Sequence, residues 1–170
     1  MKTVFKLAVT LIAVFSFPVS SSFAQVSANA LITGTIVTPI SISKTVDVNF
    51  GNIAISGAAG TVILAPSGVR TVTGGVTLPS VSGTLTAASF TITGQGSYTY
   101  SITLPSSPLT ISSGANNMSV DKFTSSTAAT GTLSSGTQTF HVGATLNIAG
   151  NQSAGTYFSA TPFNVTVNYN

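Results

Sequence analysis

Apolar and polar residues alternate along most of the chain, and the alternation is most regular in residues 86–104. The apolar positions of one parity flank a glycine-containing connection at residues 94–97: Ala88, Phe90, Ile92, Tyr98, Tyr100, Ile102 and Leu104. Because strand side chains point alternately to two faces, this pattern predicts two strands with one apolar and one hydroxyl-rich face. A short connection that contains Gly usually closes an antiparallel pair, so the sequence predicts a β-hairpin here.

Two further strands are expected before this hairpin. Residues 26–36 alternate moderately, and residues 40–50 alternate sharply, with Ser, Thr, Asp and Asn on the polar parity. Lys44 interrupts the apolar parity, which predicts a bend or a strand end where its ammonium group reaches water. Gly51 is expected to end the second strand.

The following stretch predicts a loop and two strands. Residues 57–60 are expected to form the loop, and the continuous apolar run at residues 61–65, TVILA, predicts a strand buried on both faces. A turn is predicted at Pro66, Ser67 and Gly68. Residues 69–78 then predict a weaker strand, interrupted by two consecutive glycines.

The last third of the chain begins irregularly and ends with two amphipathic strands. Prolines and Ser-Ser-Gly punctuate residues 105–117, and a strand is expected from Met118 to Phe123. Residues 125–136 predict a Ser/Thr/Gly-rich loop, and residues 137–148 and 163–170 alternate regularly. Eight to ten short strands separated by turn residues predict an all-β antiparallel sandwich, preferably of immunoglobulin-like type.

The N-terminus predicts export. Lys2 and Lys6 precede an apolar run at residues 7–19, and Ser22-Phe23-Ala24 has the small-x-small pattern of a signal-peptidase site. We therefore expect a signal peptide at residues 1–24, cleavage after Ala24, and a single mature domain at residues 25–170. The run is shorter than the roughly 20 apolar residues that span a bilayer, so no stable membrane anchor is expected after cleavage.

Composition adds two constraints. Charged residues make up 4% of the chain, and no cysteine is present, so disulfides are excluded and an exported fold must be held by packing and strand pairing. The mature chain contains three scattered cationic residues, Lys44, Arg70 and Lys122, and two carboxylates, Asp47 and Asp121. Nucleic acid is therefore not an expected partner, because phosphate binding needs clustered Lys and Arg.

The inventory of reactive side chains argues against an enzyme. A Ser-His-Asp set is formally available from His141 with Asp47 or Asp121, but His141 lies on the polar parity of its strand and no G-x-S-x-G motif occurs. Nothing in the sequence places a carboxylate beside it. We expect a solvent-facing histidine, no catalytic residues and no cofactor.

Metal and sugar sites are weakly supported. Asp121 with Asn116 and Asn117 could contact calcium, but two carboxylates in the mature chain argue against tight binding, so no metal site is expected. Tyr98 and Tyr100 share the apolar parity of their strand, which favours core packing, with hydroxyls at the rim, over an exposed platform for a ligand.

Several segments together resemble a known family. They are TPISI at 38–42, VNFG at 48–51, FTITG at 90–94, YTY at 98–100, VGATL at 142–146 and FNVTVNYN at 163–170. The mature chain resembles the family catalogued as domain of unknown function 4402, whose members are exported bacterial proteins similar to major subunits of Mat/Ecp fimbriae and, more distantly, to spore-coat protein U and chaperone-usher pilins. The resemblance implies an immunoglobulin-like fold and a surface or filament role, and it supplies no catalytic residues.

The first residues of the mature chain have two interpretations. The segment from Gln25 to Val37 alternates as a donor strand does when it fills the open groove of a neighbouring subunit, although Ala28, Ala30 and Gly34 are small anchors. It could instead pair within its own sandwich, which is favoured because consecutive strands usually lie side by side.

Two functions remain open. The first is a structural or adhesive protein of the cell surface, with fimbrium-like assembly through strand pairing; it is favoured because few Lys or Pro residues protect the strand edges. The alternative is a soluble periplasmic or secreted module that binds a small ligand or a glycan.

Overall fold

The computed structural model describes residues 24–170, and all regular secondary structure within them is β-strand. The strands are β1 (Ser41–Val46), β2 (Asn49–Phe50), β3 (Ala54–Leu64), β4 (Arg70–Thr77), β5 (Leu85–Thr86), β6 (Ala88–Thr93), β7 (Thr99–Thr103), β8 (Leu109–Ser113), β9 (Asn116–Ser125), β10 (Thr130–Thr132), β11 (Thr137–Ile148) and β12 (Thr166–Tyr169). All of them lie in the unit Ile36–Asn170, and residues 24–35 belong to a separate unit. The predicted all-β fold is confirmed.

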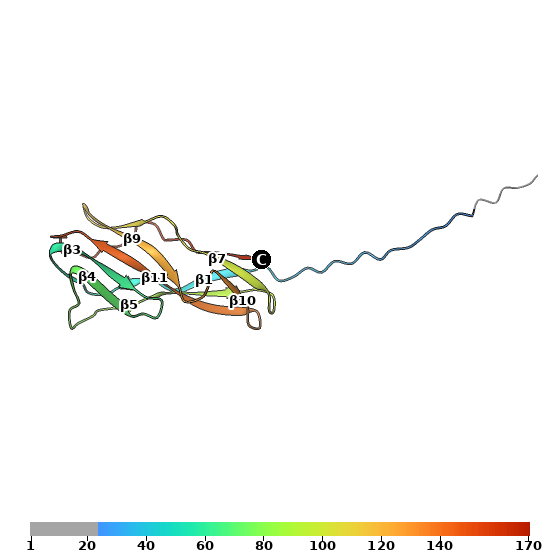
Figure 1. Ribbon diagram of the computed structural model, residues 1–170, viewed down its shortest axis with the longest axis horizontal. Coiled ribbons are helices and arrows are strands. Elements are labelled where there is room, and N and C mark those ends of the chain that lie inside the picture. Colours follow the sequence, from blue (N-terminus) through green and yellow to red (C-terminus); the bar gives the residue numbers. More distant parts are fainter. Residues whose placement is uncertain (1–23) are drawn as a thin grey trace, which may run out of the picture. The chain divides into compact units, whose positions relative to one another are not determined.

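Antiparallel pairing arranges these strands in three sheets. The largest has seven strands in the order β1-β6-β11-β3-β4, with β9 paired to β11 and β8 paired to β9. A three-stranded sheet has the order β10-β7-β12, and β2 pairs with β5. In Figure 1, β3, β4 and β9 lie near one end of the strand-bearing unit, and β1, β7 and β10 lie near the other. The unit is an antiparallel sandwich with curled sheets.

Strand β11 links the two ends of this unit. Its first half, residues 137–142, pairs with β6, and its second half pairs with β3 on residues 144–148 and with β9 on residues 142–147. The apolar parity predicted for this strand is confirmed, because the side chains of Phe140, Val142, Ala144, Leu146 and Ile148 are all buried. One amphipathic strand thus contributes to every part of the core.

Two hydrophobic clusters fill the interior. The first joins β6 and β11 of the large sheet to β7 and β12 of the three-stranded sheet, and it includes Phe90 and Phe140, whose stacked ring centroids lie 5.5 Å apart. The second lies along β3, β4, β9 and the second half of β11, around Val62, Val120 and Leu146. Since the first cluster draws on both sheets, it is the interface that makes the unit a sandwich.

The predicted hairpin in residues 86–104 is wrong, although the apolar faces predicted within β6 and β7 are buried. Strand β6 pairs with β1 and β11, whereas β7 pairs with β10 and β12, so the connection at residues 94–97 crosses from one sheet to the other. Ile92 and Ile102 still meet in the first cluster. Two amphipathic strands bury the same parity whether they pair edge to edge or face each other across a core, so alternation cannot distinguish the two arrangements.

Two predictions around residues 57–65 are also corrected. The run at 61–65 is buried on one face only, because Val62 and Leu64 are inside but 43% of Ile63 is exposed. The expected loop at residues 57–60 lies within β3, which runs from Ala54 to Leu64 with a break in its register against β4. There Gly60 faces Gly74 of β4, and a side chain on either residue would collide with the opposite backbone. The glycines that suggested a loop instead permit close strand pairing.

The remaining differences concern short or terminal strands. Strands β8 and β10 lie in regions expected to be irregular, and β12 begins at Thr166 rather than at residue 163. The irregularity expected at Lys44 is confirmed as a break in the β1–β6 register between Lys44 and Val46. No strand occurs between residues 24 and 40, so the strand expected at residues 26–36 is not observed.

Gly143 tests the importance of β11. It lies where the pairing of β11 passes from β6 to β3 and β9, and a Cβ here would collide with the carbonyl oxygen of Leu64 and with the backbone of the next two residues. We expect Gly143→Ala to lower the free energy of unfolding by about 1–3 kcal/mol, as overpacking does. Urea unfolding followed by circular dichroism measures the change.

Gly57→Ala is the matched control. Its Cβ would meet only Oδ1 of Asn151, at 3.5 Å, an ordinary contact, and its φ is not positive. Its effect should stay within about 0.5 kcal/mol. Equal effects of the two substitutions would contradict the role assigned to β11.

Candidate functional site

His141 lies on the exposed face of β11, as predicted. Its backbone N–H donates a hydrogen bond to Oγ of Ser126 at 2.9 Å, and its carbonyl oxygen accepts one from the N–H of Ser126 at 2.9 Å. The two carboxylates lie elsewhere: Asp47 forms an ion pair with Lys44, and Asp121 lies opposite Thr145, four positions further along β11. Within residues 24–170 the structure therefore does not bring His141 and a carboxylate together.

The residues considered for calcium do not converge either. Oδ1 of Asn116 accepts a hydrogen bond from Ser153, and Oδ1 of Asn117 accepts one from Oγ of Ser112 at 2.8 Å. Asp121 lies four residues beyond Asn117 on β9, a separation of roughly 13 Å along an extended strand. In the part of the chain that the structure describes, no three His, Cys, Asp or Glu residues form a group that could hold a metal ion.

The two tyrosines of the β7 region differ in environment. Tyr100 is completely buried in the first cluster, as its parity predicts, whereas 44% of Tyr98 is exposed, which corrects the expectation of core packing. Tyr98 follows the connection between the sheets and precedes β7, so it lies at the rim, where its ring centroid is 5.5 Å from that of Tyr169. The hydroxyl of Tyr169 donates to the carbonyl oxygen of Thr38 at 2.8 Å and accepts from the N–H of Gln95 at 2.6 Å.

Two strand edges on the same side of the first cluster are open. Within residues 24–170, strand β12 pairs only with β7 and β1 pairs only with β6, although Cα atoms of β1 and β12 approach within 8 Å. Half-buried apolar side chains flank these edges: Ile40 just before β1 and Ile42 within it, and Phe163 and Val165 before β12. An unpaired edge beside partly covered apolar side chains is the arrangement to which a further strand can be added.

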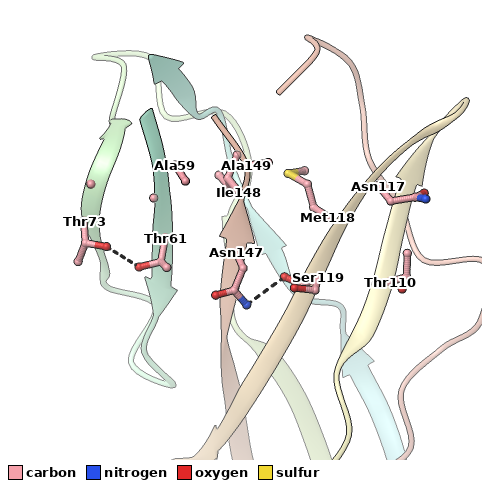
Figure 2. A pocket seen from close by; sticks show the side chains of 12 residues that line it. Ala59, Thr61, Thr73, Thr110, Asn117, Met118, Ser119, Asn147, Ile148 and Ala149 are labelled. Atoms are coloured by element: carbon pink, nitrogen blue, oxygen red, sulfur yellow. Dashed lines mark hydrogen bonds between the residues drawn. The ribbon is translucent and has the colours of Figure 1, made fainter. Parts of the chain in front are cut away.

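A groove of about 710 Å³ lies in the large sheet, over the end of β11, and we call it the polar groove after the row of hydroxyl and amide side chains along it (Figure 2). Thr61 and Thr73 line one side, on β3 and β4, and Thr110 and Ser119 line the other, on β8 and β9. Asn147 lies between them and donates a hydrogen bond from Nδ2 to the carbonyl oxygen of Ser119 at 3.4 Å. Sequence reasoning missed this groove, because each strand contributes only one or two polar positions to it.

The signal peptide predicted at residues 1–24 lies almost entirely outside the residues that the structure describes, so it stays a prediction. Among residues 24–170 the structure contains no helix with the length and apolar character needed to cross a membrane.

Comparison with known proteins gives one match. The family model described as "Domain of unknown function (DUF4402)" matches residues 40–169. No curated protein and no solved structure matches the chain.

The buried hydroxyl of Tyr100 generates a prediction about stability and pH. Its oxygen has no hydrogen-bond partner among the described residues, and burial raises the pKa of the hydroxyl above the ordinary value of 10.0. Because the pKa is higher in the folded state, the unfolded chain ionises first, so ionisation of this hydroxyl does not affect stability below pH 10 and lowers it as the pH rises from there through the folded-state pKa. We expect Tyr100→Phe to raise the free energy of unfolding by about 1 kcal/mol at pH 7, since it removes an unpaired buried hydroxyl.

Urea unfolding at pH 7 and at pH 11 separates the two effects. Tyr100→Phe should lose less stability between these pH values than the unchanged chain, whereas Tyr98→Phe, at a residue that is 44% exposed, should behave like the unchanged chain. Destabilisation by Tyr100→Phe at pH 7 would show that the hydroxyl has a bonding partner after all.

Proposed function

Because this chain belongs to the DUF4402 family, a domain of unknown function, we propose its role from its own residues: an exported, non-enzymatic surface or structural protein that assembles with further copies through β-strand pairing, as fimbrial subunits do. In this proposal, residues 1–24 direct export and are removed. The segment from Gln25 to Val37 then acts as a donor strand for a neighbouring copy.

The exposure of the donor segment carries the proposal. It alternates as a strand would, yet it forms no strand, and Val26, Leu31 and Ile32 are each more than 90% exposed, at 92%, 98% and 97%. Ile36 is completely exposed. Covering a large aliphatic side chain is worth about 1.5–3 kcal/mol, so this segment gains considerably from a partner that pairs with its backbone and covers one of its faces.

The open edges beside the first cluster supply a matching acceptor. A strand added next to β12 would form hydrogen bonds to its free edge and cover Phe163 and Val165. Ala28, Ala30 and Gly34 bury little area, so the affinity of such a donor depends on Val26, Ile32 and Ile36, which share its apolar parity. Without cysteine, no disulfide holds the acceptor, and the first cluster must keep it in place.

The chemistry of the chain supports a role in contact rather than catalysis. Charged residues make up 4% of the sequence, and the single histidine lies apart from both aspartates. General acid–base and nucleophilic catalysis need ionisable groups within hydrogen-bond distance of each other. The β12 edge also carries none of the lysines that commonly block edge-to-edge pairing, which favours assembly at that edge, whereas β1 carries Lys44.

Deletion of the donor segment tests the proposal. A chain that lacks the residues from Gln25 to Val37 should remain folded as a monomer but lose all higher assemblies, because the acceptor edge has nothing to bind. Light scattering coupled to size-exclusion chromatography and electron microscopy measure assembly, and circular dichroism verifies the fold. Unchanged assembly would reject the donor role.

A pair of charge-matched variants distinguishes strand addition from a general effect of the segment. Ile32→Asp with Ile36→Asp places two carboxylates on the apolar parity, and we expect assembly to fall at least tenfold. Thr33→Asp with Thr35→Asp adds the same charge on the opposite parity and should assemble to within about threefold of the unchanged chain. Equal losses would indicate charge repulsion rather than burial of one strand face.

A further inference from the structure

The polar groove of the large sheet is built from one continuous row of side chains. Register pairing places these residues directly opposite one another across five strands: Thr73 on β4, Thr61 on β3, Asn147 on β11, Ser119 on β9 and Thr110 on β8. Opposed residues of antiparallel strands point to the same face, and neighbouring strands lie about 4.8 Å apart. The row therefore extends about 19 Å across the sheet, with one hydrogen-bonding side chain per strand.

Several groups in this groove keep unused hydrogen-bonding capacity. The hydroxyl groups of Thr61 and Thr73 bond to each other at 2.7 Å, so one of their two protons is left over. Among the described residues, the side chains of Thr110 and Ser119 and the Oδ1 atom of Asn147 form no hydrogen bonds in the structure. The groove thus offers both donors and acceptors at fixed spacings.

No lining residue of the groove carries a charge. The lining also includes Gly60, Gly74, Met118 and Ile148, of which Ile148 is buried in the second cluster and Met118 packs against that cluster. A volume of about 710 Å³ lies within the roughly 300–1,000 Å³ typical of small-molecule sites. A charged ligand would lose its hydration without gaining a counter-charge here, so the lining selects a neutral ligand rich in hydroxyl groups.

An exposed aromatic ring stands at the border of this face. Phe158 forms a two-bond antiparallel bridge with Ser112 of β8, at N···O distances of 2.9 and 3.1 Å, and 68% of its surface is exposed. Ser112 lies opposite Asn117, which lines the groove, and directly opposed residues point to one face. Phe158 therefore lies on the face that carries the polar row, and it comes from a loop rather than from a strand.

We propose that this groove binds a neutral saccharide. The hydroxyl groups of the sugar exchange hydrogen bonds with the row from Thr73 to Thr110, and the apolar face of one sugar ring packs on Phe158. Fixed polar groups combined with an apolar surface give orientation and affinity in small-ligand sites. All residues involved lie in the unit Ile36–Asn170, so the proposal does not depend on strand donation.

Binding of defined trisaccharides to the full chain tests the proposal. The neutral probes are maltotriose, cellotriose, mannotriose and chitotriose, and the acidic probe is trigalacturonate. Calorimetry and saturation-transfer NMR measure the binding of each probe. We expect at least one neutral trisaccharide to bind with a dissociation constant of about 1 mM or tighter, and trigalacturonate to bind at least tenfold more weakly. Absence of binding by all neutral probes, or tighter binding of the acidic one, would overturn the proposal.

Three substitutions locate the site on the folded protein. Phe158→Ala removes the exposed ring and should weaken binding of the best neutral trisaccharide at least tenfold. Thr110→Val removes an exposed hydroxyl at constant shape and should weaken it at least threefold. Asn147→Asp places a charge in the row and should weaken it at least tenfold. Thr139→Val, on the same strand β11 but outside the groove, should bind within twofold of the unchanged chain. Unchanged binding in Phe158→Ala and Thr110→Val, with the fold intact by circular dichroism, would overturn the assignment.

Discussion

The structure depends on the burial of one face of β11. Its alternate residues from Phe140 to Ile148 are all buried, and they contribute first to the cluster between the two sheets and then to the cluster along β3, β4 and β9. A chain with neither disulfides nor more than a few charges has no other strong source of stability than apolar burial and the backbone pairing that accompanies it. The polar groove lies on the sheet that contains β11, and the β12 edge lies on the sheet that packs against β11 through the first cluster.

Alternation in the sequence predicts which face of each strand is buried, but not which strand lies beside it. The apolar parities of residues 88–92, 100–102 and 140–148 were all correct, because a one-residue shift would expose every one of these side chains. The hairpin prediction was wrong because two strands that pair edge to edge and two strands that face each other across a core show the same alternation. The prediction that Ile63 is buried was wrong because β-branched residues are also common on half-exposed strand faces.

The candidate sites differ in how far the sequence could show them. The expectation of no catalytic residues was argued from one histidine and two aspartates, and within residues 24–170 Asp47 forms an ion pair with Lys44 and Asp121 lies opposite Thr145. The groove could not be predicted, because its row joins residues up to 86 positions apart, from Thr61 to Asn147, whose alignment depends on strand order and register. Phe158 lies in a loop without periodicity, so only its bridge to Ser112 relates it to the groove.

We propose that this chain works by contact, and that strand pairing between copies is the central interaction. Hydrogen exchange of the backbone amides in residues 25–37 measures that pairing directly, because amides in a paired strand exchange slowly and those in an unpaired segment exchange freely. The account predicts protection at alternate residues of this segment in assembled material and none in the isolated monomer. Free exchange throughout the segment in the assembled material would contradict it.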